Sequence, residues 1–544
     1  MATTMTGSLP QVDGKMTAEE RKVIFASSLG TVFEWYDFYI YGTLATILAK
    51  QFFSGVEPAA AFIFTLLAFA AGFAVRPFGA LVFGHVGDLV GRKYTFLVTI
   101  TCMGMGTFLI GVLPSFASAG ITAPILLIAL RLLQGLALGG EYGGAAIYVA
   151  EHAPKGKRGL FTSWIQTTAT LGLFVALLLV LGVRTYTGEE AFAAWGWRVP
   201  FLVSIVLLVV SLWIRLKLNE SPLFLQMKEE GTRSKAPLKE AFGTWRYARI
   251  AILALLGATA GEAVVWYGGQ FYALFFLTTT LSVKPTIAQI MIVVALALGT
   301  PFFILFGWLS DKIGRKPIIM AGFALAALTY FPIFHGITHY ANPALEAALA
   351  SAPVTVTADP GECAFQFNPV GTAKFKSSCD TVKSNLAKLS VNYKNVVAPA
   401  GTTASVQIGD ETIAADAPDF AKVLKAAVVK HGYPASADPA QINTVMTVLL
   451  LTVLVIYVTL VYAPIAAWLV ELFPTRIRYT GLSLPYHIGN GWFGGFLPAT
   501  VFAIVASTGN IYSGLWYPIV VAAASLVIGL LLLPETRNVD ITTE

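Results

Sequence analysis

Long apolar runs recur along almost the whole length of this chain of 544 residues. Each run is long enough for a helix to cross the hydrocarbon core of a bilayer, which takes roughly 20 residues. Only 12% of the residues are charged, about half of the roughly 25% that is usual in soluble domains, so a soluble fold would expose large apolar patches. We therefore predict an all-α membrane protein with twelve transmembrane helices. These helices are expected at residues 23–50, 59–84, 94–113, 121–149, 160–183, 199–217, 248–280, 286–309, 317–340, 444–471, 480–506 and 512–533.

The positions of Lys and Arg predict how these helices are oriented. If both termini are cytoplasmic, the cytoplasmic segments hold 22 of the 36 Lys and Arg residues, as the positive-inside rule requires. The polar N-terminus and the length of the first run argue against a cleavable signal peptide. The predicted parts are a cytoplasmic tail (1–22), a six-helix bundle (23–217), a cytoplasmic loop (218–247), a second six-helix bundle (248–340 and 444–533) and a second cytoplasmic tail (534–544).

A polar segment at residues 341–443 interrupts the second bundle and is expected on the outer side of the membrane. Residues 405–415 have the pattern of a β-hairpin with a Gly-Asp turn, and residues 418–431 that of a helix, so we predict a small folded insertion. A disulfide between Cys363 and Cys379 is permitted outside the cytoplasm, although spacing alone does not show that the sulfurs meet. Whether the insertion covers the outer vestibule or is a tolerated addition stays open.

Two motifs occur twice in the chain. Gly84–Lys93 and Gly307–Lys316 share Gly, Asp, Gly, Arg and Lys at matching offsets, 223 residues apart. A second motif with Glu, Pro and Arg starts at Glu151 and again at Glu471, 320 residues later. The difference of 97 residues matches the size of the insertion, so we predict two pseudo-symmetric six-helix halves.

We predict that the doubled loops form a cytoplasmic gate that holds the two halves together in one conformation. An Asp at a helix end accepts charge-assisted hydrogen bonds and favours a neighbouring helix N-terminus, and glycines let helices approach closely. The alternative is that these loops are basic turns that set topology alone. The predicted gate residues are Gly84, Asp88, Arg92, Glu151, Arg158, Asp311, Arg315, Glu471 and Arg478.

The doubled Gly-Asp-x-x-Gly-Arg-Lys loop resembles the signature of the major facilitator superfamily. More narrowly, the chain resembles its metabolite:proton symporter family in the segments Phe33–Phe38, Arg76–Gly79, Arg131–Gly135, Gly139–Gly144, Gly196–Phe201 and Glu471–Arg476. The resemblance implies a bacterial inner-membrane importer similar to the proline/betaine, shikimate, 2-oxoglutarate and citrate uptake proteins. The insertion departs from the family pattern, and the chain lacks the long coiled-coil tail of the osmosensing betaine members, which makes osmotic regulation a weaker expectation.

Ionisable side chains within the predicted helices need a reason, because each costs roughly 2.5–3.5 kcal/mol at mid-depth. Glu34, Asp37 and Tyr41 share one face of the first helix. We predict that the two carboxyls couple transport to protons and that Tyr41 lines a cavity; the alternative is a static ion pair. Arg76 and Arg131 are the predicted ligands of a substrate carboxylate, which an Arg binds through two parallel hydrogen bonds. The alternatives are a salt bridge for Arg131 and a packing role for Arg76.

Glu262, Trp266 and Gln270 recur at intervals of four in the seventh predicted helix. We predict that this stripe lines the substrate cavity from the second half, and the alternative is a lipid-facing or packing role. Glu141 is flanked by glycines that favour close helix packing, so its role is open between a functional and a structural one. His487 and Asn490 are weaker candidates for the cavity.

The sequence contains no Walker loop and no protease or hydrolase signature, so we expect neither an enzyme nor a cofactor, a metal site or a nucleic-acid partner. The expected function is proton-coupled import of a small organic solute by a monomer, through alternating access. Two buried arginines favour a carboxylate, and a zwitterion such as betaine or proline is the alternative. An alternative of another class is a membrane sensor that uses the insertion.

Overall fold

The computed structural model describes residues 18–54, 65, 68, 70–216, 222–232, 234–364, 376–389 and 391–541. Within these residues, ten helical stretches are long and apolar enough to cross a membrane. Each coincides with one predicted run, which confirms a helical membrane protein. The stretches are Lys93–Val112, Thr122–His152, Arg158–Thr187, Arg198–Leu216, Trp245–Thr280, Pro285–Ile313, Arg315–Ala341, Thr444–Leu472, Thr475–Val505 and Ser513–Leu532.

The first two predicted runs are not among these ten stretches. Helices α1 (Ala18–Thr43) and α2 (Ala45–Phe52) occupy the first run. Helix α4 (Arg76–Leu89) forms the end of the second run, whose residues 59–64, 66, 67 and 69 lie outside the described residues. The total of twelve therefore stays a prediction.

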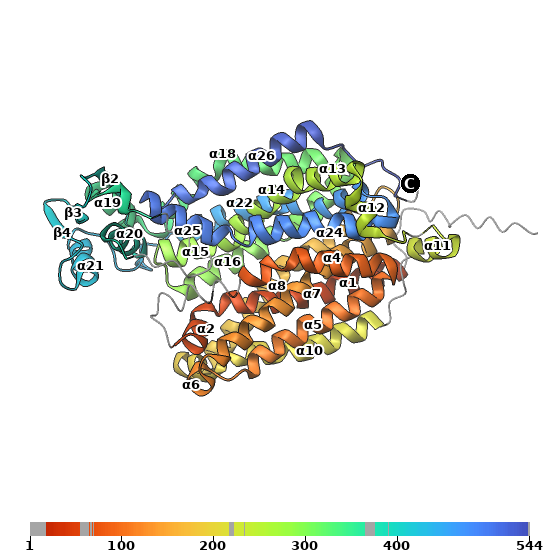
Figure 1. The fold of residues 1–544 in the computed structure, drawn as a ribbon, viewed down its shortest axis with the longest axis horizontal. Coiled ribbons are helices and arrows are strands. Elements are labelled where there is room, and N and C mark those ends of the chain that lie inside the picture. Colours follow the sequence, from red (N-terminus) through yellow and green to blue (C-terminus); the bar gives the residue numbers. More distant parts are fainter. Residues whose placement is uncertain are drawn as a thin grey trace, which may run out of the picture.

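The first half consists of the red to yellow helices, which pack together on one side of Figure 1. In it, α1 packs against α8, α5 against α10, and α4 against α7. Glycines allow the last contact, because a Cβ at Gly139 would lie 2.2 Å from the backbone oxygen of Arg76. The elements after α4 are α5 (Arg92–Val112), α6 (Phe116–Ala119), α7 (Thr122–His152), α8 (Arg158–Thr187), α9 (Glu189–Ala191), the π-helical turn η1 (Phe192–Gly196) and α10 (Arg198–Leu216).

The second half begins with one long helix in which α-helical and π-helical turns alternate. Its parts are α13 (Trp245–Ala254), η2 (Leu255–Thr259), α14 (Ala260–Trp266), η3 (Tyr267–Tyr272), α15 (Ala273–Phe275) and η4 (Phe276–Thr280). Such π-helical turns are frequent at functional sites. The remaining elements are α16 (Pro285–Gly299), α17 (Pro301–Ile313), α18 (Arg315–Ala341), α22 (Thr444–Tyr462), α23 (Ile465–Leu472), η6 (Thr475–Ile477), α24 (Arg478–Ile488), η7 (Gly489–Gly494), α25 (Leu497–Thr508), η8 (Ser513–Leu515) and α26 (Trp516–Leu532).

The insertion folds around a four-stranded sheet in the order β2-β1-β3-β4. Strand β1 pairs parallel with β2 and antiparallel with β3, and β3 pairs antiparallel with β4. The predicted hairpin is confirmed as β3 and β4, and the predicted helix as α21. The elements are α19 (Pro343–Ser351), β1 (Val354–Ala358), η5 (Pro360–Glu362), α20 (Ser378–Lys388), β2 (Tyr393–Val397), β3 (Ser405–Ile408), β4 (Glu411–Ala414) and α21 (Phe420–Lys430).

Hydrogen bonds fix the insertion to the second half. The Tyr393 amide donates to the Gly509 carbonyl over 2.7 Å, and the Ile511 amide donates to the Asn392 side chain over 2.7 Å. Figure 1 shows the insertion at one end of the bundle and α11 (Pro222–Glu230), α12 (Pro237–Gly243) and the C-terminal end at the other. We call these the insertion end and the loop end.

A disulfide joins Cys363 and Cys379, whose Cα atoms are 5.2 Å apart. Replacing both with Ala is expected to destabilise the insertion by roughly 3 kcal/mol, because the bond closes a short loop and restricts the unfolded chain. Protease sensitivity of the insertion measures this change. Cys102→Ala, which removes the free cysteine, is the control and should leave it unchanged. Equal sensitivity of the double variant and the wild type would contradict the prediction.

Candidate functional site

Two arginines from different helices of the first half meet near the middle of the molecule. Arg76 is the first residue of α4, Arg131 lies within α7, and each is only 1% exposed. The Arg131 guanidinium lies 4.3 Å from the centre of the Tyr41 ring, and that of Arg76 lies 4.1 Å from the centre of the Phe73 ring. Both lie with Phe38 around a tightly packed gap that is too narrow to hold a water molecule. The first half thus presents two buried positive charges beside aromatic faces.

A chain of polar contacts connects Arg131 toward Asp37. Arg131 donates to the Gln134 side chain over 2.8 Å, and Gln134 donates to the Thr107 hydroxyl over 2.7 Å. Thr107 in turn lies beside the carboxyl of Asp37, which is 5% exposed. A proton on Asp37 can therefore change the hydrogen bonds that hold Arg131.

The other two predicted residues of the first helix differ in what the structure shows. The Tyr41 hydroxyl donates to the Thr65 carbonyl over 3.1 Å, while its ring faces Arg131. The backbone of Glu34 belongs to α1, but its side chain lies outside the described residues. Its role in proton coupling stays a prediction.

The predicted stripe of the second half faces the first half. Glu262 is fully buried and accepts a hydrogen bond from Asn490 over 2.9 Å. The Trp266 ring stacks on Tyr39 of the first half at a centroid distance of 6.0 Å. Gln270 donates to the Thr170 hydroxyl of α8 over 3.3 Å. The π-helical turn η3 carries Gln270 at this contact.

Among the buried polar atoms without a hydrogen-bond partner in the part of the chain that is described, one group lies where the halves meet, and others lie elsewhere. Such atoms are rare in folded proteins, so a group of them calls for an explanation. The members of this group belong to residues of both halves that sit around the two arginines and the stripe. The atoms are Oδ1 of Asp37, the hydroxyls of Tyr39 and Tyr267, Nε and Nη2 of Arg76, Oε1 of Glu262, Nε1 of Trp266, Oε1 of Gln270 and both ring nitrogens of His487.

Aromatic side chains join the halves next to this site. The rings of Tyr142 and Tyr486 are parallel, with centroids 3.5 Å apart, and the hydroxyls of Tyr486 and Tyr462 are 2.8 Å apart. Gln166 donates to the Tyr142 hydroxyl and to the Tyr462 carbonyl. Our sequence analysis missed this cluster, and the only signal was a polar Gln in an otherwise apolar run.

The side chain of Glu141 connects three helices of the first half. Its carboxylate accepts a charge-assisted hydrogen bond from Arg215 of α10 over 2.5 Å and another from Thr99 of α5 over 2.9 Å. All three side chains belong to the first half, and Glu141 and Arg215 are 2% and 3% exposed. The contacts favour the structural alternative.

At the loop end, each half caps a helix of the other half through an Asp of the doubled loops. Asp88 accepts from the amide and hydroxyl of Thr480, near the start of α24, over 2.9 and 2.7 Å. Asp311 accepts from the amides of Gly159 and Leu160, at the start of α8, over 2.9 and 2.8 Å. A carboxylate at a helix N-terminus is favourable in charge and satisfies free amides. The two copies of the sequence motif therefore make equivalent contacts, because the Asp of each copy caps a helix of the other half.

Buried ion pairs reinforce these caps. Glu471 pairs with Arg158 over 3.2 Å and with Arg315 over 3.1 Å, and Arg478 pairs with Glu151 over 2.8 Å. The Arg158 and Arg478 pairs cross between the halves in opposite directions.

The close contact between α4 and α24 depends on a glycine. A Cβ at Gly84 would lie 3.2 Å from the Cα of Thr480. Of the nine predicted gate residues, Arg92 alone has a side chain outside the described residues, and the structure brings the other eight together.

Residues 534–541 lie across this gate, which the sequence did not indicate. The carbonyls of Val539 and Ile541 accept from Arg158 and Arg478 over 2.8 and 3.0 Å. Thr536 donates to Glu471 over 2.6 Å. The segment thus adds hydrogen bonds to the predicted gate residues beyond the contacts of the loops themselves.

Comparison with known proteins finds matches to transporters. A family described as "Sugar (and other) transporter" matches residues 22–246. The chain is 38% identical to a proline/betaine transporter of Salmonella typhimurium over 58% of its own length and 64% of that protein's, so the match spans less than two thirds of that relative. It is 35% identical to a shikimate transporter of Escherichia coli over 61% of its own length and 76% of that protein's.

The fold is also similar to that of a solved transporter. The proton:xylose symporter XylE, bound to 6-bromo-6-deoxy-D-glucose, superposes with a TM-score of 0.64 at 14% identity, over 96% of this chain and 98% of that one. The doubled loops, the paired halves and these relatives agree: the chain belongs to the major facilitator superfamily and, within it, to the metabolite:proton symporter family.

Proposed function

We propose that this protein is a symporter that imports a small organic carboxylate together with protons. The observation that carries the proposal is the pair of buried arginines, Arg76 and Arg131, of which Arg76 also lies beside Tyr267 of the opposite half. Each guanidinium can hold a carboxylate through two parallel hydrogen bonds, and burial strengthens that attraction. The relative of Escherichia coli named a shikimate transporter supports a carboxylate, because shikimate is one.

The transport cycle that we propose is alternating access between the two halves. The ion pairs and caps close the loop end in this conformation, so the site would next open toward the insertion end. The excess of Lys and Arg in the predicted cytoplasmic segments supports a cytoplasmic loop end and an outer insertion end. In this orientation both termini are cytoplasmic, and the proton gradient drives uptake without a cofactor.

Proton coupling would use the carboxyls beside the arginines. Protonation of Asp37 would rearrange the hydrogen bonds through Thr107 and Gln134 that hold Arg131 and so free the guanidinium for the substrate. Glu262 supplies a second buried carboxyl on the opposite side, with only Asn490 as its hydrogen-bond donor among the described residues. Either carboxyl can carry a proton across, and substitution of each by its amide separates their roles.

A zwitterion such as betaine or proline is the second candidate substrate, and one observation favours it. The rings of Trp35, Tyr39 and Trp266 lie together, with centroid distances of 5.7 to 6.0 Å. Aromatic faces attract quaternary ammonium groups, and the nearby Glu262 would add a negative charge. The relative of Salmonella typhimurium is named a proline/betaine transporter.

The test is uptake into proteoliposomes of purified protein under an imposed pH gradient. Labelled mono- and dicarboxylates are compared with labelled betaine and proline, and external pH is recorded. Uptake of carboxylates with alkalinisation of the medium is expected. Uptake of betaine alone would move the assignment to the second candidate. Solute binding without any uptake would instead support the sensor and refute the symporter.

A further inference from the structure

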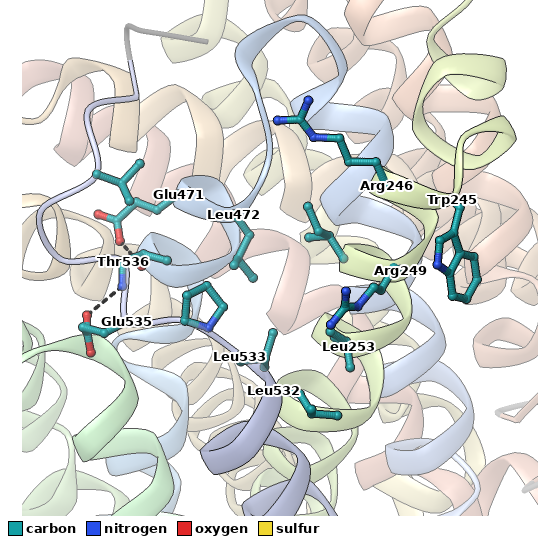
Figure 2. Close-up of a pocket in the computed structure, with 13 residues that line it drawn as sticks. Trp245, Arg246, Arg249, Leu253, Glu471, Leu472, Leu532, Leu533, Glu535 and Thr536 are labelled. Carbon is teal, nitrogen blue, oxygen red and sulfur yellow. Dashed lines mark hydrogen bonds between the residues drawn. The ribbon is translucent and has the colours of Figure 1, made fainter.

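A pocket of about 420 Å³ opens at the loop end, away from the central site (Figure 2). It lies between the start of α13, the end of α23, the end of α26 and the segment that follows α26. Its size is within the usual range of small-molecule sites, roughly 300–1,000 Å³. One wall is shared with the gate through Glu471 and Thr536, but the pocket itself has no role in the proposed transport cycle.

The charged side chains of this pocket that have no ion-pair partner among the described residues are positive. Arg246 and Arg249 of α13 border it on one side, and both are exposed. Neither has an ion pair among the described residues, and the one contact recorded for Arg246 is a cation–π contact with Tyr247. Two cations are thus available to an anion that enters.

The carboxylates on the opposite wall are already engaged. Glu471 holds Arg158 and Arg315. Glu535 accepts hydrogen bonds from the backbone amides of Arg315 and Lys316 over 3.0 and 2.9 Å. The charge of Glu471 is balanced by its two arginines, and that of Glu535 is stabilised by amides at the start of α18, so both oppose an incoming anion less than free carboxylates would.

The walls and the rim of the pocket place it at a membrane interface. Trp245, the first residue of the membrane-capable stretch Trp245–Thr280, borders the pocket and is 72% exposed. Tryptophans are enriched where hydrocarbon meets headgroups. Apolar side chains of Leu253, Leu532 and Leu533 line the pocket below the arginines. The ligand that fits is amphipathic, with an anionic head and an apolar body.

We propose that this pocket binds the phosphate of an anionic phospholipid headgroup, with Arg246 and Arg249 on the phosphate and the leucines against the acyl chains. Basic pockets between membrane helices are a known way to bind such lipids. The chemistry that the arginines recognise is a phosphate anion, and free phosphate is the other source of it. Binding at this pocket does not depend on the chain being a symporter.

The test measures binding of fluorescent phosphatidylglycerol to the purified full chain in detergent micelles, with phosphatidylcholine as the neutral comparison. The variant R246Q/R249Q is expected to bind phosphatidylglycerol about 30-fold more weakly, since each interfacial arginine contributes about a factor of five. The matched control K235Q/K239Q removes two exposed charges of the same end outside the pocket and should bind like the wild type.

Two further measurements distinguish loss of charge from misfolding, and a lipid ligand from a soluble anion. The variant R246K/R249K keeps both charges and should retain binding, whereas its loss of binding would contradict the proposal. If millimolar inorganic phosphate displaces the labelled lipid, the pocket binds anions, and free phosphate is assigned as its ligand. Absence of competition would support the lipid. Equal affinity of R246Q/R249Q and the wild type for phosphatidylglycerol would overturn the site.

Discussion

Arg131→Lys is expected to lower uptake about tenfold to 150-fold, which corresponds to the roughly 1.5–3 kcal/mol of one hydrogen bond to a charged group. Arg131 already donates to Gln134 and lies over the Tyr41 ring, so its planar group offers its remaining donors to a substrate in a fixed direction. A Lys ammonium is a compact point charge and cannot make the Gln134 contact and a two-pronged carboxylate contact together. Initial uptake rate per folded transporter measures the change.

The matched control is Arg198→Lys, outside the site. Arg198 donates to the carbonyls of Gly111 and Leu113 over 2.8 and 2.7 Å within the first half. This variant should lower stability modestly and leave the uptake rate per folded molecule near that of the wild type. If Arg131→Lys transports normally, Arg131 is not a substrate ligand. If both variants lose uptake equally, the effect of Arg131→Lys is structural.

The parts of this molecule that depend on local pattern were predictable from the sequence. The membrane helices could be predicted from the length and composition of the apolar runs, and the hairpin at residues 405–415 from its turn residues. The stripe of Glu262, Trp266 and Gln270 was predictable because residues at intervals of four share a helix face. The doubled loops were predictable because both copies keep the same spacing.

The features that depend on packing between distant segments were not predictable in the same way. Tyr142 and Tyr486 are 344 residues apart in the sequence, and only the docking of α7 and α24 brings their rings together. The parallel pairing of β1 with β2 depends on how α20 crosses over. The role of Glu141 stayed open because its partner Arg215 lies on another helix.

Glu471→Gln is expected to open the loop end. It removes the charge that Arg158 and Arg315 share at a site where Glu471 is 5% exposed. Breaking a buried pair by changing one partner costs roughly 3–5 kcal/mol, because it leaves an uncompensated buried charge. The substitution raises the free energy of the closed conformation, because the arginines are exposed to water again once the halves separate. The equilibrium between closed and open gates should therefore shift toward the open form by about a hundredfold or more.

Maleimide labelling of a buried cysteine measures this shift. Ser163 is fully buried, and a Cβ on Gly307 of the opposite half would lie 2.4 Å from it, so Ser163→Cys in a Cys102→Ser background reports separation of the halves. The labelling rate from the loop end should rise about a hundredfold with Glu471→Gln. The matched control Glu240→Gln breaks the half-exposed Glu240–Arg476 pair at the same end, which is worth about 1 kcal/mol or less, and should change the rate less than about fivefold. Equal labelling of Glu471→Gln and the wild type would mean that the ion pairs of Glu471 do not hold the gate, which would leave that role to the caps from Asp88 and Asp311 and to the Glu151–Arg478 pair.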